Sequence, residues 1–198
     1  MSNDRLDHNT LEHLFLQARS HTGWQDKSIS DAQLHELYDL AKWGPTSMNC
    51  LPMRLAFLKS PAAKTRLKPM LAEGNIDKAM AAPVTVIVAS DTQFYEHMPT
   101  LFPYIDTARA MYADNATLSE QTAFRNSSLQ GAYLILAARS LGLDVGPMSG
   151  FDNNQVDREF FPDGRYESNF LINIGYGDHA ALHPRGPRFE FEEVCTLY

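Results

Sequence analysis

The sequence has few cysteines and no long hydrophobic run. Only Cys50 and Cys195 are present among 198 residues, and their wide separation argues against a disulfide framework and against a structural zinc site. The longest apolar stretch, Gly131–Leu143, is short and contains Arg139, so no membrane span is predicted. The polar, acidic N-terminus Met1–Asp7 lacks the basic and apolar regions of a signal peptide, which predicts a cytoplasmic protein.

The chain also lacks an excess of basic residues. Its formal net charge is -7, its pI is near 5.4, and the lysines and arginines are scattered. This balance argues against binding to a nucleic-acid backbone or to an anionic membrane, and it favours a small molecule or another protein as partner. With 44% hydrophobic residues, the chain is long enough to bury one core, and we expect residues 1–198 to form a single domain.

Several familiar functional motifs are absent. Ser149 lies in Gly146–Gly150, which reads G-x-x-S-G and is not the G-x-S-x-G turn of a hydrolase. Gly175–Gly177 follows a predicted strand but lacks the third glycine of a dinucleotide fingerprint, and there is no P-loop. His179 and His183 have a helical spacing that suits a metal, but no third ligand stands near them in the sequence, so no metal site is predicted.

Hydrophobic periodicity predicts helices interleaved with strands. Residues 83–89 form the clearest strand, and their β-branched side chains place them in the middle of a sheet. Without a regular βαβ alternation, the pattern favours an α+β layer fold. The expected helices cover 9–19, 31–43, 62–71, 75–82, 120–141 and 153–161, with one or two short helices in 91–119. The expected strands cover 53–59, 83–89 and 168–175, with an extended piece in 142–152 and an extended C-terminal part from His183 to Val194.

The stretch Trp43–Pro52 has an unusual density of neutral hydrogen-bonding side chains. It follows the second predicted helix, which Gly44 and Pro45 end. Thr46, Ser47 and Asn49 are its candidate binding residues, although Ser47 and Asn49, taken singly, are explained as turn or capping residues.

Other polar groups could join this stretch in a site assembled from several loops. Each of them has an ordinary structural explanation, such as a cation near a helix end, a solvated lysine or a turn glycine. Only the set as a whole indicates a binding site. Its further members are Arg19 and Ser20, Asn75 and Lys78, Pro147, Met148, Ser149 and Gly150, and Arg185 and Arg188.

Over essentially its full length the chain resembles the nitroreductase family of FMN-dependent oxidoreductases. Within that family it resembles the branch of malonic semialdehyde reductases of the Rut pathway of pyrimidine degradation. The segments that carry the resemblance are Trp43–Cys50, Thr122–Ser128, Gly146–Asp152 and Leu171–Asp178.

The resemblance implies a nitroreductase-like fold with a central, mostly antiparallel or mixed sheet flanked by helices. It also implies a homodimer with FMN at the interface and a C-terminal extension that embraces the partner. By position, Arg19, Ser20, Arg185 and Arg188 match residues that hold the phosphate, and guanidinium groups suit a dianion. Asn75 and Lys78 match residues at the pyrimidine edge of the flavin. Pro147, Met148, Ser149 and Gly150 match the turn against the ring, and Pro45, Thr46, Ser47 and Asn49 match the stretch that the partner contributes.

The implied activity is NAD(P)H oxidation by ping-pong hydride transfer through flavin N5, with reduction of malonic semialdehyde to 3-hydroxypropionate. NADH or NADPH would bind only transiently, which agrees with the missing dinucleotide motif. Arg109 and Arg125 are candidates for holding the substrate carboxylate, and the aromatic segment Phe94–Tyr112 is either a lid or part of the core.

Two departures from the family pattern matter: Thr22 stands where many members have a basic residue, and Leu51 stands where many have Gln. Two alternatives remain open: a flavin-binding or salvage protein without turnover, and a reductase with broad activity on quinones and nitroaromatics.

Overall fold

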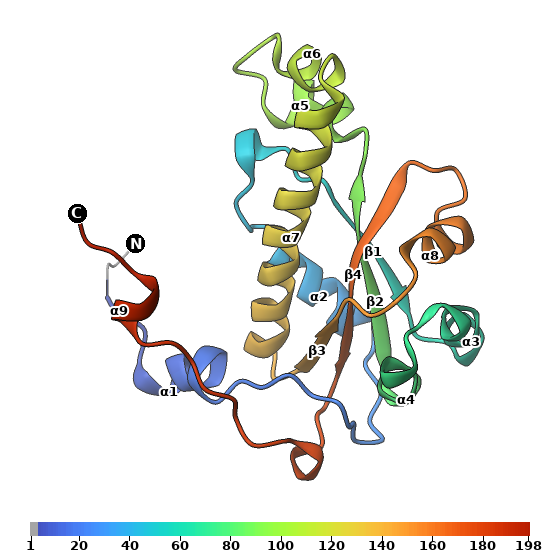
Figure 1. The fold of residues 1–198 in the computed structure, drawn as a ribbon, viewed down its shortest axis with the longest axis vertical. Coiled ribbons are helices and arrows are strands. Elements are labelled where there is room, and N and C mark those ends of the chain that lie inside the picture. The colour runs from blue at the N-terminus through green and yellow to red at the C-terminus, as the bar shows by residue number, and fades with distance from the viewer. Residues whose placement is uncertain (1–3) are drawn as a thin grey trace.

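The computed structural model describes residues 4–198 as a sheet with helices on both faces (Figure 1). The strand order is β1-β2-β4-β3, and every ladder in the sheet is antiparallel. This confirms the predicted α+β fold and the central place of the strand at 83–89. The strands are β1 (Met53–Leu58), β2 (Val84–Asp91), β3 (Asp144–Met148) and β4 (Tyr166–Gly175).

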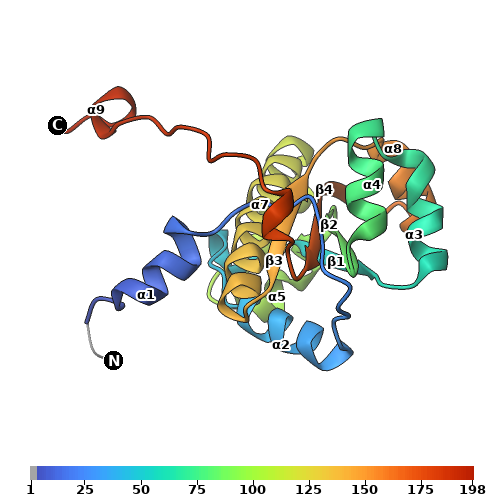
Figure 2. The same ribbon diagram turned by 90° about the horizontal axis from the view of Figure 1, so that it is seen from below.

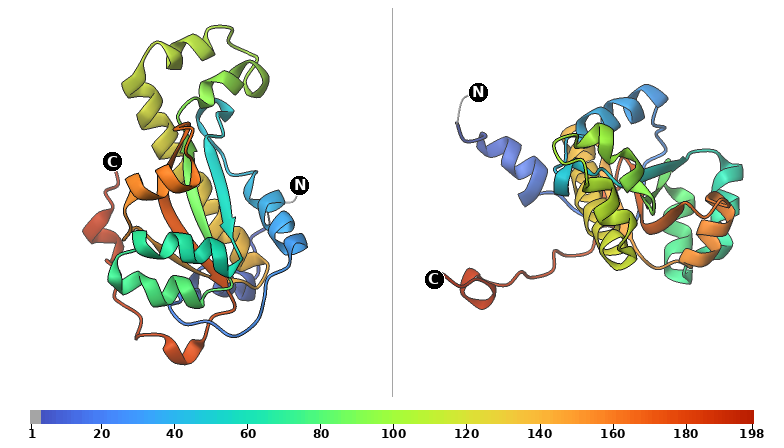
Figure 3. Two further views of the ribbon diagram at one scale, coloured as in Figure 1. Left: turned by 90° about the vertical axis from the view of Figure 1, so that its right-hand side faces the viewer. Right: turned by 90° about the horizontal axis from the view of Figure 1, so that it is seen from above.

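The helices form two layers and one end of the molecule. α2 and α7 cover one face of the sheet, α3, α4 and α8 cover the other, and α5 and α6 lie beyond one end (Figures 1 and 3). None of the helices in the described part of the chain combines the length and the apolar content needed to cross a membrane. The helices are α1 (His8–Leu11), α2 (Asp31–Ala41), α3 (Pro61–Leu67), α4 (Glu73–Ala81), α5 (Met98–Leu101), α6 (Ala108–Ala113), α7 (Ala116–Ser140), α8 (Asn153–Phe160) and α9 (Phe191–Val194). Short helical turns are Glu12–Leu16, Ser47–Asn49, Lys68–Met70, Phe94–His97 and His179–Ala181.

Alternation along β2 builds a core on both faces of the sheet. Val84, Val86 and Val88 pack toward α2 and α7, whereas Ile87 and Ala89 pack toward α3, α4 and α8. This is the period of two that a strand imposes on its side chains. Because both faces are covered, β2 is buried along its whole length.

The helix predicted for residues 9–19 is wrong at its C-terminal end. Helical structure stops at Leu16, and Ser20 instead pairs with Val145 of β3 through an isolated parallel bridge. Arg185 Nη2 also donates hydrogen bonds to the carbonyl oxygens of Leu16 and Ala18, at 2.7 and 3.0 Å. Tertiary contacts therefore replace the last helical turn, and Arg19 and Ser20 lie in an extended segment beside the sheet.

The long helix and the C-terminal part also differ from the prediction. α7 begins at Ala116, four residues before the predicted start, because the Asn115 side chain accepts the N–H of Leu118 at 3.0 Å and caps it. The part from His183 to Val194 was expected to follow a surface, but residues 183–198 project away from the body of this chain (Figure 2) and are exposed throughout.

Candidate functional site

One end of strand β3 carries a pocket lined with arginine. Its volume is about 240 Å³, and it brings together three segments: the 18–20 segment, the end of α7 and the start of the C-terminal extension. The four guanidinium groups belong to Arg19, Arg139, Arg185 and Arg188, and Ser20 also lines the pocket. The structure thus joins residues that the sequence separates by more than 160 positions.

The guanidinium groups of this arginine pocket are held by backbone carbonyls and have no carboxylate partner. Arg19 Nη2 donates to the carbonyl oxygen of His183 at 2.6 Å, and Arg139 Nη1 donates to that of Leu14 at 3.0 Å. No ion pair within residues 4–198 involves any of the four arginines. The pocket therefore concentrates positive charge that an anion would compensate.

Arg139 is the member of the pocket that the sequence did not predict. Burial lowers the pKa of its guanidinium, Asp144 opposes that effect and Arg185 adds to it. Its Nε is buried and has no hydrogen-bond partner in the described part of the chain. A dianionic phosphate would satisfy this orphaned donor, so the pocket fits the phosphate of FMN. The signal was present in the sequence as the single cation within the apolar run Gly131–Leu143.

The far end of β3 holds the residues predicted to lie against the flavin ring. The carbonyl oxygen of Gly150 accepts hydrogen bonds from the backbone N–H of Ala72 at 2.9 Å and from Asn75 Nδ2 at 3.0 Å. Ser149 and Gly150 follow the last residue of β3, so their N–H groups lie outside its ladder with β4. From Val145 to Gly150 the chain runs five residues, about 17 Å of extended strand. The two ends suit an elongated ligand with an anionic end.

Trp24 links the loop after Ser20 to α4. Its indole Nε1–H donates to the carbonyl oxygen of Lys78 on α4 at 3.1 Å. Lys78 and Asn75 stand three residues apart on α4, so they share one face of the helix. Thr22, one of the two departures from the family pattern, is partly buried in this same loop.

The turn at Thr46, Ser47 and Asn49 lies elsewhere in the chain. The Ser47 N–H donates to Asn126 Oδ1 of α7 at 2.8 Å, and Asn49 Nδ2 donates to the carbonyl oxygen of Leu101 at 2.9 Å. From Asn126 to Arg139, α7 rises roughly 20 Å. Within one chain the structure therefore does not bring Pro45, Thr46, Ser47 and Asn49 together with the arginine pocket.

The backbone of this turn is strained. Met48, Asn49 and Leu51 have φ angles of 49°, 51° and 40°, a region that residues other than glycine rarely occupy. Each such residue costs about 1–3 kcal/mol, and strain of this kind is concentrated at functional sites. The contacts that fix the turn include the N–H of Leu51 donating to Thr46 Oγ1 at 3.2 Å.

The two substrate-binding candidates have different surroundings. Arg109 Nη2 lies 3.9 Å from a carboxylate oxygen of Glu96, so its charge is partly compensated. Arg125 is exposed on α7 and forms no ion pair within residues 4–198. In the aromatic segment, Phe94 and Tyr112 are buried in a core cluster with Met98 and Cys50.

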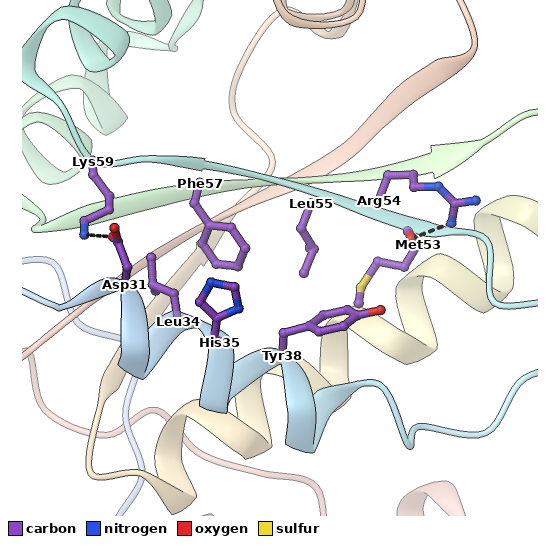
Figure 4. A pocket seen from close by; sticks show the side chains of 9 residues that line it. All are labelled: Asp31, Leu34, His35, Tyr38, Met53, Arg54, Leu55, Phe57 and Lys59. Atoms are coloured by element: carbon purple, nitrogen blue, oxygen red, sulfur yellow. Dashed lines mark hydrogen bonds and ion pairs between the residues drawn. The ribbon is translucent and has the colours of Figure 1, made fainter.

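The largest cavity described in the chain, about 600 Å³, lies apart from all the predicted flavin residues. It is a groove between α2 and the edge strand β1, with side chains from both pointing into it (Figure 4). Lys59 pairs with Asp31 across one end of the groove, and Arg54 borders the other. Its middle is apolar, formed by Leu34, Leu55 and Phe57.

Comparisons with known proteins point to one family. A family model described as the nitroreductase family matches residues 16–176. A Burkholderia lata protein, provisionally named NADH dehydrogenase/NAD(P)H nitroreductase, is 60% identical over 192 residues, which cover 97% of this chain and 98% of that protein. A Polynucleobacter asymbioticus protein with the same provisional name is 54% identical, covering 97% of each chain.

Solved structures show the same fold. A Bacillus subtilis protein provisionally described as a nitroreductase has a TM-score of 0.88 at 22% identity, covering 97% of this chain and 100% of its own. An Exiguobacterium sibiricum protein with the same provisional description, solved in complex with FMN, has a TM-score of 0.83 at 19% identity and covers 100% of both chains. At these identities the likeness establishes the fold.

Proposed function

This chain belongs to the nitroreductase family, and we propose that it is an FMN-dependent oxidoreductase that takes electrons from NADH or NADPH. The observation that carries the proposal is the arginine pocket at one end of β3, with its uncompensated guanidinium groups. The FMN complex of the Exiguobacterium sibiricum protein and the names of the two sequence relatives support the choice of cofactor and donor.

Different residues along β3 would contact different parts of the FMN molecule. Arg19, Ser20, Arg139, Arg185 and Arg188 would hold the phosphate, while Asn75 and Lys78 would contact the pyrimidine edge of the ring. Residues 147–150 would support the ring, and the backbone N–H groups of Ser149 and Gly150, which lie beyond the ladder with β4, would be able to donate to it. When bound, FMN would supply the chemistry of hydride transfer between the nicotinamide and an acceptor. The protein contributes position and positive charge.

The proposed enzyme is a homodimer, because one chain leaves its site incomplete. The strained turn at residues 46–51 is held far from the arginine pocket of its own chain, so it would serve the flavin of the partner. α7 also exposes large apolar side chains that a partner would cover, namely Phe124, Leu129 and Tyr133.

The C-terminal extension would dock in the groove between α2 and β1 of the second copy. Phe189, Phe191, Val194 and Leu197 are 53–84% exposed in the single chain, so the extension has no core of its own. Replacing Phe191 by Ser should raise the dimer dissociation constant in sedimentation equilibrium, whereas Glu192→Ser should have a smaller effect. Monomeric wild-type protein would exclude this arrangement.

For the acceptor we propose malonic semialdehyde, which one hydride and one proton convert to 3-hydroxypropionate. Arg125 is the better candidate for the carboxylate, since Arg109 is close to Glu96. A broad reductase of quinones and nitroaromatics is the alternative, and comparison of kcat/KM for the three acceptor classes distinguishes them. With Arg125→Ala, the value for the semialdehyde should fall and that for an uncharged quinone should not.

The visible absorption spectrum tests the central proposal. Protein loaded with FMN and passed through gel filtration should stay yellow and should bleach when NADH or NADPH is added without oxygen. A colourless protein would refute the proposed cofactor. A yellow protein that neither donor bleaches would instead be a flavin-binding protein without turnover.

A further inference from the structure

Two imidazoles and one carboxylate meet beside the start of β3. His21 comes from the loop after Ser20, Asp144 is the first residue of β3, and His179 begins the turn after β4. One ligand atom from each lies within 4.8 Å of the other two. The sequence pattern paired His179 with His183 and found no third ligand, whereas the tertiary structure supplies His21 and Asp144.

The distances suit a small metal ion. His21 Nε2 lies 3.2 Å from Asp144 Oδ1. Two ligands at about 2.0–2.2 Å from a tetrahedral zinc ion are roughly 3.4 Å apart, so this pair is already correctly spaced. His179 would have to approach by at most about 1.4 Å on the same geometry, and its exposed position on a short turn allows that movement.

Two of the three ligands are held in place. The His21 side chain is almost fully buried, and its backbone N–H donates to the carbonyl oxygen of Val145 at 2.9 Å. Asp144 Oδ2 accepts the backbone N–H of Gly177 at 2.9 Å, which orients the carboxylate as outer-shell hydrogen bonds do in metal sites.

The His21 ring has one nitrogen available for an ion. A Cβ built on Gly177 would lie 2.0 Å from His21 Nδ1, so that nitrogen packs against the Gly177 backbone. Nδ1 is buried and lacks a hydrogen-bond partner within residues 4–198. Nε2 is therefore the atom that faces Asp144 and would bind a metal.

We propose that His21, Asp144 and His179 form a binding site for one divalent transition-metal ion, such as Zn²⁺, Co²⁺ or Ni²⁺. Two imidazoles and one carboxylate are the ligand set that such ions prefer, and the exposed side at His179 leaves a position for water. Hard cations such as Mg²⁺ are disfavoured, because they prefer oxygen ligands and only one of the three ligands here is a carboxylate. The bound ion would join the loop after Ser20, β3 and the turn that leads into the C-terminal extension.

A Co²⁺ titration of the chelator-treated, full-length protein tests this site without requiring flavin. The wild type should bind one Co²⁺ per chain and develop visible d–d absorption, and Zn²⁺ should displace the Co²⁺. His179→Ala should weaken binding at least tenfold, and because His179 is exposed, this variant should still fold. His183→Ala is the matched control: it removes a neighbouring exposed imidazole outside the cluster and should bind Co²⁺ like the wild type.

Two results would overturn the site. One is a wild type that develops no d–d bands with Co²⁺. The other is equal Co²⁺ affinity in His179→Ala and His183→Ala, because it would show that the ion binds elsewhere. A rise in Tm with Zn²⁺ that EDTA reverses in the wild type and in His183→Ala, but is lost in His179→Ala, would support the site by an independent measurement.

Discussion

Asn75 Nδ2 donates a hydrogen bond to the carbonyl oxygen of Gly150 at 3.0 Å, and this contact joins α4 to the turn after β3. A Cβ added at residue 150 would lie 2.6 Å from that same nitrogen and 3.3 Å from Ala72 Cβ. Glycine at this position thus lets α4 approach the turn closely enough for one ligand to touch both.

Replacing Gly150 by Ala should displace Asn75 and weaken FMN binding. The φ of Gly150 is not in the left-handed region, so the backbone tolerates alanine and the effect comes from the side-chain clash. We expect the FMN dissociation constant to rise about tenfold, equivalent to about 1.4 kcal/mol. Quenching of flavin fluorescence measures this constant.

Gly74→Ala is the matched control for this substitution, since nothing lies within 4 Å of a Cβ at that position of α4. It should leave FMN affinity unchanged and raise the free energy of unfolding by roughly 0.5–1 kcal/mol, because alanine is the better helix former. Equal FMN affinity in the two variants would contradict the proposed role of the Asn75–Gly150 contact.

Replacing Arg139 by Gln should lower FMN affinity at least tenfold, or about 1.4 kcal/mol. The substitution removes one of four positive charges around the pocket, so the dissociation constant should also depend less steeply on salt concentration. Arg158→Gln, which removes an exposed arginine of α8 outside the pocket, should change neither property. The same salt dependence in both variants would mean that Arg139 does not face the phosphate.

Asp91 should be essential for stability. It is fully buried at the end of β2 and lies 2.7 Å from Arg54 Nη2 and 3.0 Å from Arg165 Nε. Asp91→Ala removes the buried partner of both guanidinium groups and leaves Arg165 with the more distant carboxylate of Glu96, at 3.7 Å. We expect the free energy of unfolding measured by urea denaturation to fall by about 3 kcal/mol. Asp31→Ala breaks an exposed ion pair with Lys59, and its free energy of unfolding should equal that of the wild type within experimental error. Similar losses in the two variants would show that Asp91 contributes no more than a surface carboxylate.

Cys50 should make stability fall at high pH. Burial raises the pKa of its thiol from 9.0 to about 11, so between these values the unfolded chain loses a proton that the folded chain keeps. The free energy of unfolding therefore decreases with rising pH in that window, by roughly 2 to 3 kcal/mol in total. When urea denaturation is measured from pH 8 to pH 11, the free energy of unfolding should decline less steeply for Cys50→Ala than for the wild type. Parallel curves would refute the shifted thiol.

Local patterns predicted most of the helices and strands, since periodicity and caps are properties of neighbouring residues. The β-branched run at residues 83–89, which forms most of β2, is an example. The end of the first helix could not be predicted in this way, because Arg185, far along the chain, donates hydrogen bonds to the carbonyl oxygens of Leu16 and Ala18.

The candidate site shows the same division. The resemblance supplied Arg19, Ser20, Arg185 and Arg188, and the structure brings all four to one pocket. Arg139 was not predicted, because only the packing of α7 against the N-terminal segment shows that this cation lies in the pocket.

By itself, the sequence determined the family and the α+β layers and indicated the residue types of the candidate site, because these depend on composition, local periodicity and short motifs. Only the tertiary structure decided which distant residues meet. The sheet order places β3 at an edge beside Ser20, and the length of α7 separates the turn at residues 46–51 from the arginine pocket of the same chain. Such contacts depend on how the helices and strands pack in space, so the local pattern of residues along the chain does not predict them.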